Sequence, residues 1–137
     1  MVIWDGSPHP WFCPNQPPCC LMATMEDVKG AILSARFFPF EGSAGYLRLL
    51  RQLVDWYGMP VSIYQDRHRA LHRNDDHWEL EEQLVGRQEL TQVGQALAAL
   101  GIRPIFALSP EAKGRTERLF GTLQTRLMAE LDLAGWT

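Results

Sequence analysis

Short apolar runs, separated by polar segments that contain glycine or proline, predict five β-strands along this chain. We expect them at residues 2–4, 19–25, 31–38, 61–64 and 102–108. A polar turn that ends in Gly30 joins the second and third runs, which indicates an antiparallel hairpin. The first strand is expected to be very short, because the proline-rich residues 6–18 that follow indicate an irregular loop.

Two segments between these strands have apolar residues at the spacing of an α-helix. The first helix is expected at residues 44–57, where glycine and then proline follow it closely. The second is expected to begin after Thr91, a suitable N-cap, and to end at Gly101. Residues 69–89 are polar and charged, and we expect only a short helix near residues 80–84 and high mobility there.

A long helix is expected near the C-terminus, with Ser109 as its N-cap and Pro110 in its first position. Its apolar stripe, which we expect to face a core, consists of Thr116, Leu119, Phe120, Leu123, Leu127 and Leu131. Glu117 lies at the edge of that stripe. Its carboxylate is either a metal ligand or the surface partner of Lys113, four residues earlier, and the helix alone favours the surface pair.

The expected order of elements, β-β-β-α-β-α-β-α, excludes an all-helical or all-β fold and predicts an α/β protein. A mixed five-stranded sheet flanked by helices accommodates it. A chain of 137 residues is enough for one domain with a single core.

Composition places the chain among ordinary globular proteins, with 46% hydrophobic and 21% charged residues. No apolar run approaches the length of a membrane span and no signal peptide is evident, so we expect a cytoplasmic protein. The three cysteines, Cys13, Cys19 and Cys20, are an odd number and match no common zinc pattern. We therefore expect reduced, partly buried thiols.

The net charge of −3 argues against strong nonspecific binding to nucleic acid. The charge is uneven, however. Residues 113–126 contain four basic side chains and one acid, whereas residues 75–89 are mostly acidic. One face of the protein is therefore still suited to a phosphate backbone.

Three carboxylates are the candidate chemical groups: Asp5 near the end of the first strand, Asp66 at the end of the fourth, and Glu117. Carboxylate oxygens suit Mg²⁺, and two such ions catalyse in-line phosphoryl displacement. Each acid also has a structural interpretation, an Asx turn for the first and ion pairs for the other two. Asp27, Glu41 and Glu111 are interpreted as turn or cap residues.

Three blocks of sequence resemble the signature blocks of bacterial insertion-sequence transposases: residues 4–11 (WDGSPHPW), 64–68 (YQDRH) and 109–118 (SPEAKGRTER). They are most similar to the catalytic core of the ISNCY group, within the DDE transposase and retroviral-integrase superfamily. The resemblance extends over nearly the whole chain, and the third block is its most specific part.

This resemblance implies an RNase H-like fold and a catalytic, metal-binding triad of Asp5, Asp66 and Glu117, with Glu117 51 residues after Asp66. It implies Mg²⁺ or Mn²⁺ as cofactor, two ions when DNA is bound. The basic residues Lys113, Arg115 and Arg118 are then expected to contact DNA phosphates near the metals.

His68 is also assigned to this DNA-binding set, where it orients either phosphate or the second aspartate. A structural hydrogen bond explains it equally well. The implied reaction is attack of water on a phosphodiester bond at a transposon end, followed by attack of the freed 3′-hydroxyl on target DNA. A homodimer is expected from the resemblance, because transposition pairs two DNA ends.

The chain also departs from the pattern. Residues 26–30 differ from the Asp-Asp-Ala-Thr-Gly typical of relatives, and Glu111 occupies the place of a usual glutamine. From the resemblance we expect residues 1–137 to be a single catalytic core, with none left for the upstream helix-turn-helix region that recognises DNA ends. Two alternatives therefore stay open: a catalytically silent remnant that binds DNA or dimerises, and a free-standing RNase H-like nuclease.

Overall fold

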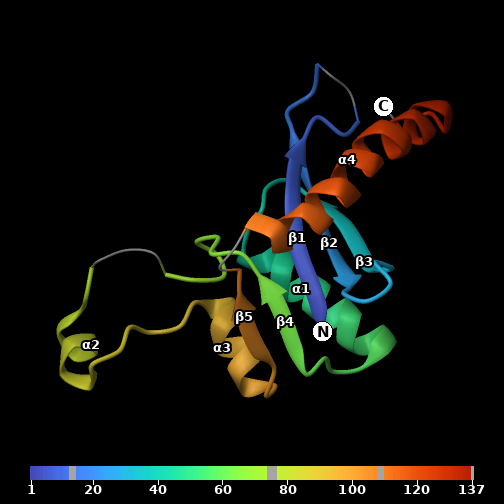
Figure 1. The fold of residues 1–137 in the computed structure, drawn as a ribbon. Helices are drawn as coiled ribbons and strands as arrows, with labels where there is room; N and C mark the ends of the chain where they lie inside the picture. The colour runs from blue at the N-terminus through green and yellow to red at the C-terminus, as the bar shows by residue number, and fades with distance from the viewer. Residues whose placement is uncertain (13–14, 74–76, 108–109, 137) are drawn as a thin grey trace.

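The computed structural model describes residues 1–12, 15–73, 77–107 and 110–136, and of residues 110–113 the helical backbone only. Its strands and helices follow the predicted order, with one additional helix, the short α2, between β4 and α3 (Figure 1). They are β1 (Val2–His9), β2 (Cys19–Glu26), β3 (Ile32–Phe38), α1 (Ser43–Tyr57), β4 (Ser62–Gln65), α2 (Leu80–Val85), α3 (Gln92–Ala99), β5 (Arg103–Phe106) and α4 (Pro110–Leu133).

The five strands form one mixed sheet in the order β3-β2-β1-β4-β5. Strands β1, β2 and β3 are antiparallel, as the hairpin pattern predicts, whereas β4 runs parallel to both β1 and β5. This confirms the expected α/β class and the mixed five-stranded sheet. The central strand β1 is the one that joins the antiparallel half to the parallel half.

Strand β1 is longer than the sequence predicts, and the expected loop over residues 6–18 is wrong in its first part. All eight residues of β1 pair with β2, from Val2 opposite Glu26 to His9 opposite Cys19. Asp5 therefore lies inside a strand and not at its end. Pro8 is tolerated because β1 pairs with β4 only near its start, which leaves one edge of its later half unpaired.

The sheet has helices on both faces. On one face, α1 and α3 cover Trp4, Cys20 and Met22, in a core that includes Leu49 and Leu97. On the other face, α4 packs Phe120, Leu123 and Leu127 against Trp11, Leu21 and Ala23. Alternate residues of β2 thus enter the two cores, which is the period expected of a strand buried on both faces.

The predicted stripe of α4 is correct in its buried members, Thr116 and Phe120. The expected cap Ser109 lies outside the described residues. The cap of α3 is confirmed, because the Thr91 hydroxyl accepts a hydrogen bond from the Gly94 amide at 3.1 Å. None of the helices in the described ranges is long and apolar enough to span a bilayer.

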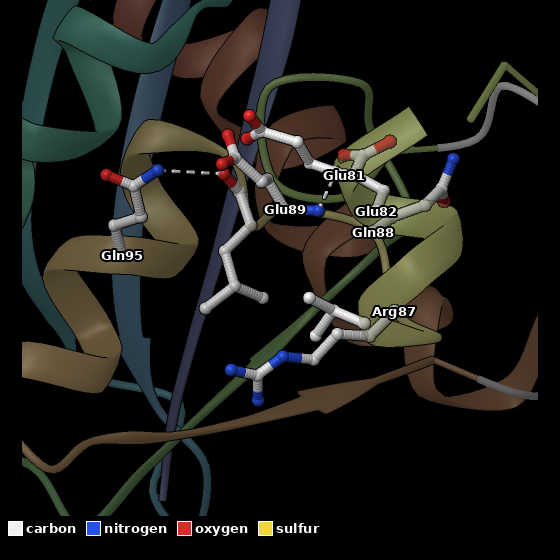
Figure 2. Close-up of a pocket in the computed structure, with 8 residues that line it drawn as sticks. Glu81, Glu82, Arg87, Gln88, Glu89 and Gln95 are labelled. Atoms are coloured by element: carbon white, nitrogen blue, oxygen red, sulfur yellow. Dashed lines mark hydrogen bonds between the residues drawn. The ribbon is translucent and has the colours of Figure 1, made fainter. Parts of the chain in front are cut away.

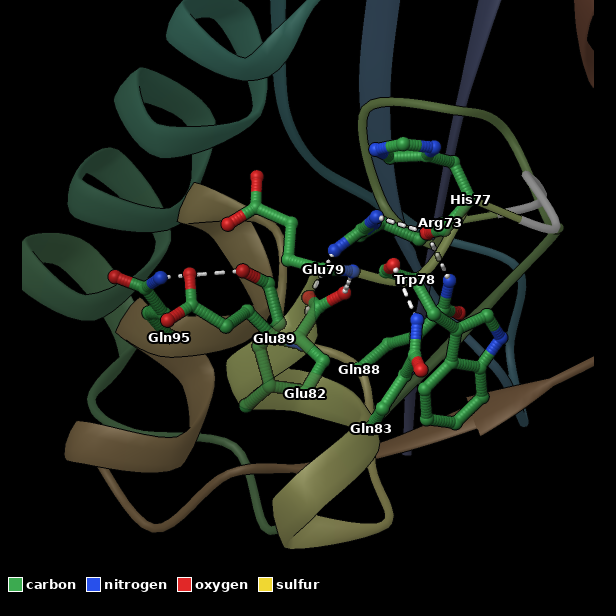
Figure 3. A network of polar contacts seen from close by, with 10 residues as sticks. Arg73, His77, Trp78, Glu79, Glu82, Gln83, Gln88, Glu89 and Gln95 are labelled. Carbon is green, nitrogen blue, oxygen red and sulfur yellow. Dashed lines mark hydrogen bonds and ion pairs between the residues drawn. The ribbon is translucent and has the colours of Figure 1, made fainter.

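The polar segment between β4 and α3 leaves the sheet as an arm that carries α2, shown apart from the body in Figure 1. Its centre is the buried carboxylate of Glu82, which binds Arg73 and accepts hydrogen bonds from the amides of Glu79 and Glu89 (Figure 3). These amides, and then Arg73, lower the pKa of Glu82. The arm therefore has its own polar centre.

Truncation of a core residue tests the two-faced packing. Leu49→Ala removes a fully buried side chain between α1 and the sheet and is expected to lower the free energy of unfolding by about 2–5 kcal/mol. Leu84→Ala, on the arm and 80% exposed, is the matched control and is expected to change it by less than about 0.5 kcal/mol. Urea unfolding measures both, and equal losses would contradict this packing.

Candidate functional site

The pairing of β1 with β4 determines where the first two candidate acids lie. Val2 pairs with Ile63 and Ile3 with Tyr64, and the same register continued by two positions puts Asp5 beside Asp66. One position before the acids, the Trp4 indole donates a hydrogen bond to the Gln65 side chain at 2.9 Å, with both residues fully buried. Two aspartates that are far apart in sequence thus meet where β4 ends.

The turn after β4 holds Asp66. Its carboxylate accepts a hydrogen bond from the His68 amide at 3.0 Å. The His68 ring nitrogen Nδ1 in turn accepts the Ala70 amide at 3.2 Å. Of the two sequence interpretations of His68, the structural hydrogen bond is present, and it is the backbone of this residue that orients the second aspartate.

Helix α4 brings the third acid to the same place. The Thr116 hydroxyl hydrogen bonds to the Asp5 carboxylate, and one end of the Gln124 side chain donates to the Ser7 hydroxyl at 3.2 Å. Thr116 is buried against the sheet, whereas the next residue, Glu117, is exposed. Glu117 therefore lies at the edge of the buried stripe of α4, as the sequence predicts.

The three acids line one open pocket of about 340 Å³. Its remaining lining residues are Gly6, Ser7, Pro8, Glu41, Phe120, Gly121 and Gln124. Within the described part of the chain, however, no three acidic, histidine or cysteine side chains are yet grouped closely enough to hold an ion. Like charges repel, so such a pocket is expected to contract only when a cation enters.

Glu41 is the lining residue that the sequence analysis misassigned. Glu41 lies in the bend between β3 and α1, but it is not a cap, because the N-cap of α1 is Gly42 and no side chain caps that helix. The Glu41 carboxylate instead accepts a hydrogen bond from the hydroxyl of Tyr46, which is fully buried. Burial, and then Glu41, raise the pKa of Tyr46, so that the phenol keeps the proton it donates.

Comparison with known proteins finds similar sequences and similar folds. No family model matches the chain. It is 36% identical over 135 residues to y4bF of Sinorhizobium fredii, which is named as a transposase, and 33% identical over 133 residues to the transposase for insertion sequence IS1202 of Streptococcus pneumoniae. These matches cover 98% and 96% of the chain. Over nearly its whole length, the chain is therefore similar to a part of insertion-sequence transposases.

The chain spans only 28% and 27% of the lengths of these two relatives. Among solved structures, it resembles the HTLV-2 integrase catalytic core domain in complex with magnesium, in dimeric and trimeric forms, with TM-scores of 0.64 and 0.62 at 17% and 19% identity. The two matches cover 95% and 94% of this chain and 70% of each integrase core chain.

The simian T-cell lymphotropic virus intasome in complex with PP2A regulatory subunit B56 gamma matches with a TM-score of 0.65 and 23% identity, over 95% of this chain and 41% of that one. These likenesses confirm the RNase H-like fold.

The basic residues predicted to bind DNA do not share one environment. Arg115 binds Asp27 in the β2–β3 turn, with 2.8 Å between its guanidinium and the carboxylate. Arg118 is exposed on α4, one residue after Glu117. The side chains of Lys113 and Glu111 lie outside the described residues. Asp27 is thus a turn residue, as expected, and in addition the ion-pair partner of Arg115.

Burial favours the protonated form of the two thiols in the described ranges. Cys20 is fully buried beneath the pocket, and burial raises its pKa to about 12, with a further contribution from Glu41. Burial also raises the pKa of Cys19. Neither is in a disulfide, as the sequence predicts, and Cys13 lies outside the described residues.

A larger pocket lies between α2 and α3 and is lined by Glu81, Glu82, Val85, Arg87, Gln88, Glu89, Leu90 and Gln95 (Figure 2). Its buried carboxylate, Glu82, is already bound by Arg73. The Gln95 amide likewise donates to the Leu90 carbonyl at 3.1 Å. This pocket therefore belongs to the structure of the arm and not to the three acids.

Burial is the main influence on Asp5 and raises its pKa from 3.8 to about 6. Hydrogen bonds from Thr116 and the Gly6 amide lower it, whereas the charges of Asp66 and Glu41 raise it further. Asp5 is thus costly to ionise in the folded protein. A bound cation would offset that cost, because an opposite charge favours the carboxylate form.

This shift predicts how stability changes with pH. Between about pH 4 and pH 6 the folded state binds more protons than the unfolded state, so the free energy of unfolding falls as pH rises. The full effect is about 3 kcal/mol. Asp5→Asn removes it, and its stability relative to the natural chain is expected to increase by up to that amount from pH 4 to pH 8.

Urea unfolding in EDTA at the two pH values measures the difference. Asp132→Asn, which changes an exposed acid far along α4, serves as the control and is expected to show no such trend. A constant difference between Asp5→Asn and the natural chain at both pH values would contradict the burial of this carboxylate.

Proposed function

We propose that this chain is the catalytic core of a DDE-type transposase, which cleaves DNA strands and joins them to target DNA with the help of divalent cations. The observation that carries the proposal is the meeting of Asp5, Asp66 and Glu117 in one pocket, in a chain homologous to transposases over nearly its whole length. The three acids come from two strands and a helix, and only the fold brings them together.

The residues present fit a magnesium site. All three are carboxylates, the hard oxygen donors that Mg²⁺ prefers, and two of them are fixed by backbone or hydroxyl hydrogen bonds. The HTLV-2 integrase core with the same fold was solved in complex with magnesium. When bound, the ions activate the attacking hydroxyl and stabilise the leaving oxygen of the phosphodiester.

The remaining roles, binding of the cations and of the DNA backbone, are assigned to residues of this chain. Asp5 and Asp66 would hold the cations at the end of β4, and Glu117 would supply a third carboxylate from α4. The DNA backbone approaches on the α4 side, where Arg118 is exposed. Arg115 joins it by exchanging Asp27 for a phosphate, because both are anions that a guanidinium binds. Lys113, two residues before Arg115 in the sequence, completes this basic set.

DNA is the proposed partner, and transposition requires two ends to be held together. The related integrase cores are described as dimeric and trimeric, so we also propose that this chain self-associates.

Cleavage of DNA tests the proposal. The protein is incubated with supercoiled plasmid, or with an oligonucleotide that carries a candidate element end, in Mg²⁺ or Mn²⁺. Nicking and strand joining are expected, and Asp66→Asn is expected to lower both by about 100-fold or more, the cost typical of losing one electrostatic group from a preorganised site. Glu130→Gln changes an exposed acid on α4, the helix that carries Glu117, and serves as the control that should retain activity.

The other two interpretations give different results. Hydrolysis of RNA–DNA hybrids without strand joining would identify a nuclease. DNA binding without any cleavage, and without a cation effect on stability, would identify a silent remnant. Nicking that survives Asp66→Asn would reject the assigned chemistry.

A further inference from the structure

The pocket has a fourth acid, Glu41, which reaches it from the opposite face of the sheet. Trp4 faces α1, where its ring lies 5.0 Å from that of Tyr46, and Gly6, two residues later, has the same orientation. Asp5 faces α4, because Thr116 binds it. Since β4 ends beside Asp5, the edge of β1 is open there, and side chains from both faces line one space.

Gly6 makes room for this approach. A Cβ atom at position 6 would lie 2.8 Å from the Glu41 carboxyl carbon, 2.9 Å from its Oε2 and 3.0 Å from the Cys20 sulfur. Real Cβ atoms do not approach carboxylates so closely. The Glu41 carboxylate therefore occupies the place that a side chain at position 6 would take, directly after Asp5 in the strand.

Tyr46 fixes the carboxylate in that place. Its buried hydroxyl donates a hydrogen bond to Oε1 of Glu41. His68 Nδ1 lies 3.9 Å from Oε1 but already accepts the Ala70 amide, so it offers Glu41 no proton in this arrangement. The described neighbours of Glu41, namely Tyr46, His68 and Gly6, thus include no fixed positive charge.

A role as hydrogen-bond acceptor alone does not explain a charged residue. An uncharged glutamine also offers an oxygen that accepts the Tyr46 hydrogen bond, more weakly than a carboxylate does but without a further negative charge beside Asp5 and Asp66. The repulsion becomes useful only when cations enter, because each additional carboxylate then strengthens their binding.

We propose that Glu41 is a fourth carboxylate of the cation pocket, held by Tyr46 across Gly6, and that the binding of divalent cations depends on it. This inference rests on the proposed function of the same pocket. It assigns Tyr46 as a positioning residue that acts through Glu41, and Gly6 as the residue that keeps its path open.

Cation binding by the 137-residue chain tests the inference. Thermal unfolding is followed while Mn²⁺ or Mg²⁺ is titrated into protein prepared in EDTA. Glu41→Gln keeps the acceptor for Tyr46, so it is expected to be at least as stable as the natural chain in EDTA. Its half-saturating cation concentration is expected to rise about 10-fold or more. Glu130→Gln is the matched control and should titrate as the natural chain does.

Tyr46→Phe provides an independent measurement, because it leaves every carboxylate in place. Its expected effect is a smaller rise in the half-saturating concentration, with the extent of cation stabilisation at saturation retained. If Glu41→Gln does not fold, this variant decides: unchanged cation binding by Tyr46→Phe overturns the inference.

The outcomes separate this inference from the proposed function. If the natural chain and Asp66→Asn both fail to respond to cations, the cation pocket itself is wrong, and the Glu41 inference falls with it. If the natural chain responds, Asp66→Asn does not, and Glu41→Gln titrates as the natural chain does, only the Glu41 inference is overturned. Glu41 is then an acceptor for a buried tyrosine and nothing more.

Discussion

The buried hydrogen bond between Trp4 and Gln65 secures the pairing on which the rest of the site depends. Only two residues of β1 pair with β4 in the parallel ladder, so little else fixes the register between these two strands. Because eight pairs with β2 hold β1 in place, a slip by one residue would turn the side chains of β4 to the other face of the sheet. Asp66 would then no longer lie beside Asp5.

Electrostatic repulsion among the carboxylates is a second feature of the site. Four carboxylates line the pocket, and one of them, Asp5, is largely removed from water. Such an arrangement lowers stability in the absence of counterions, which is common where a protein keeps a polar site ready for a ligand. Hydrogen bonds from Thr116, the Gly6 amide and the His68 amide hold the acids in spite of it.

Much of the fold was predictable from local pattern, and the errors have physical reasons. The β2–β3 hairpin, the helix after Thr91 and the stripe on α4 depend on spacing within one element, which the sequence contains directly. The length of β1 depends on β2, a partner distant in sequence, which outweighed the local effect of Pro8. The placement of Asp5, Asp66 and Glu117 was expected from family resemblance.

Glu41 could not be found in this way, because it reaches the pocket through a space that another residue leaves empty; the one available signal was an isolated glycine inside a strand, at Gly6.

The arm between β4 and α3 has its ends tied together near the sheet. The Thr91 hydroxyl donates to the Leu71 carbonyl at 3.3 Å, and the polar centre around Glu82 is closed within the arm itself. A segment whose two ends are joined at its base can be lengthened, shortened or replaced at little entropic cost. The arm is thus a natural attachment point for a probe or an inserted module, because α2 lies apart from the sheet that holds the carboxylates (Figure 1).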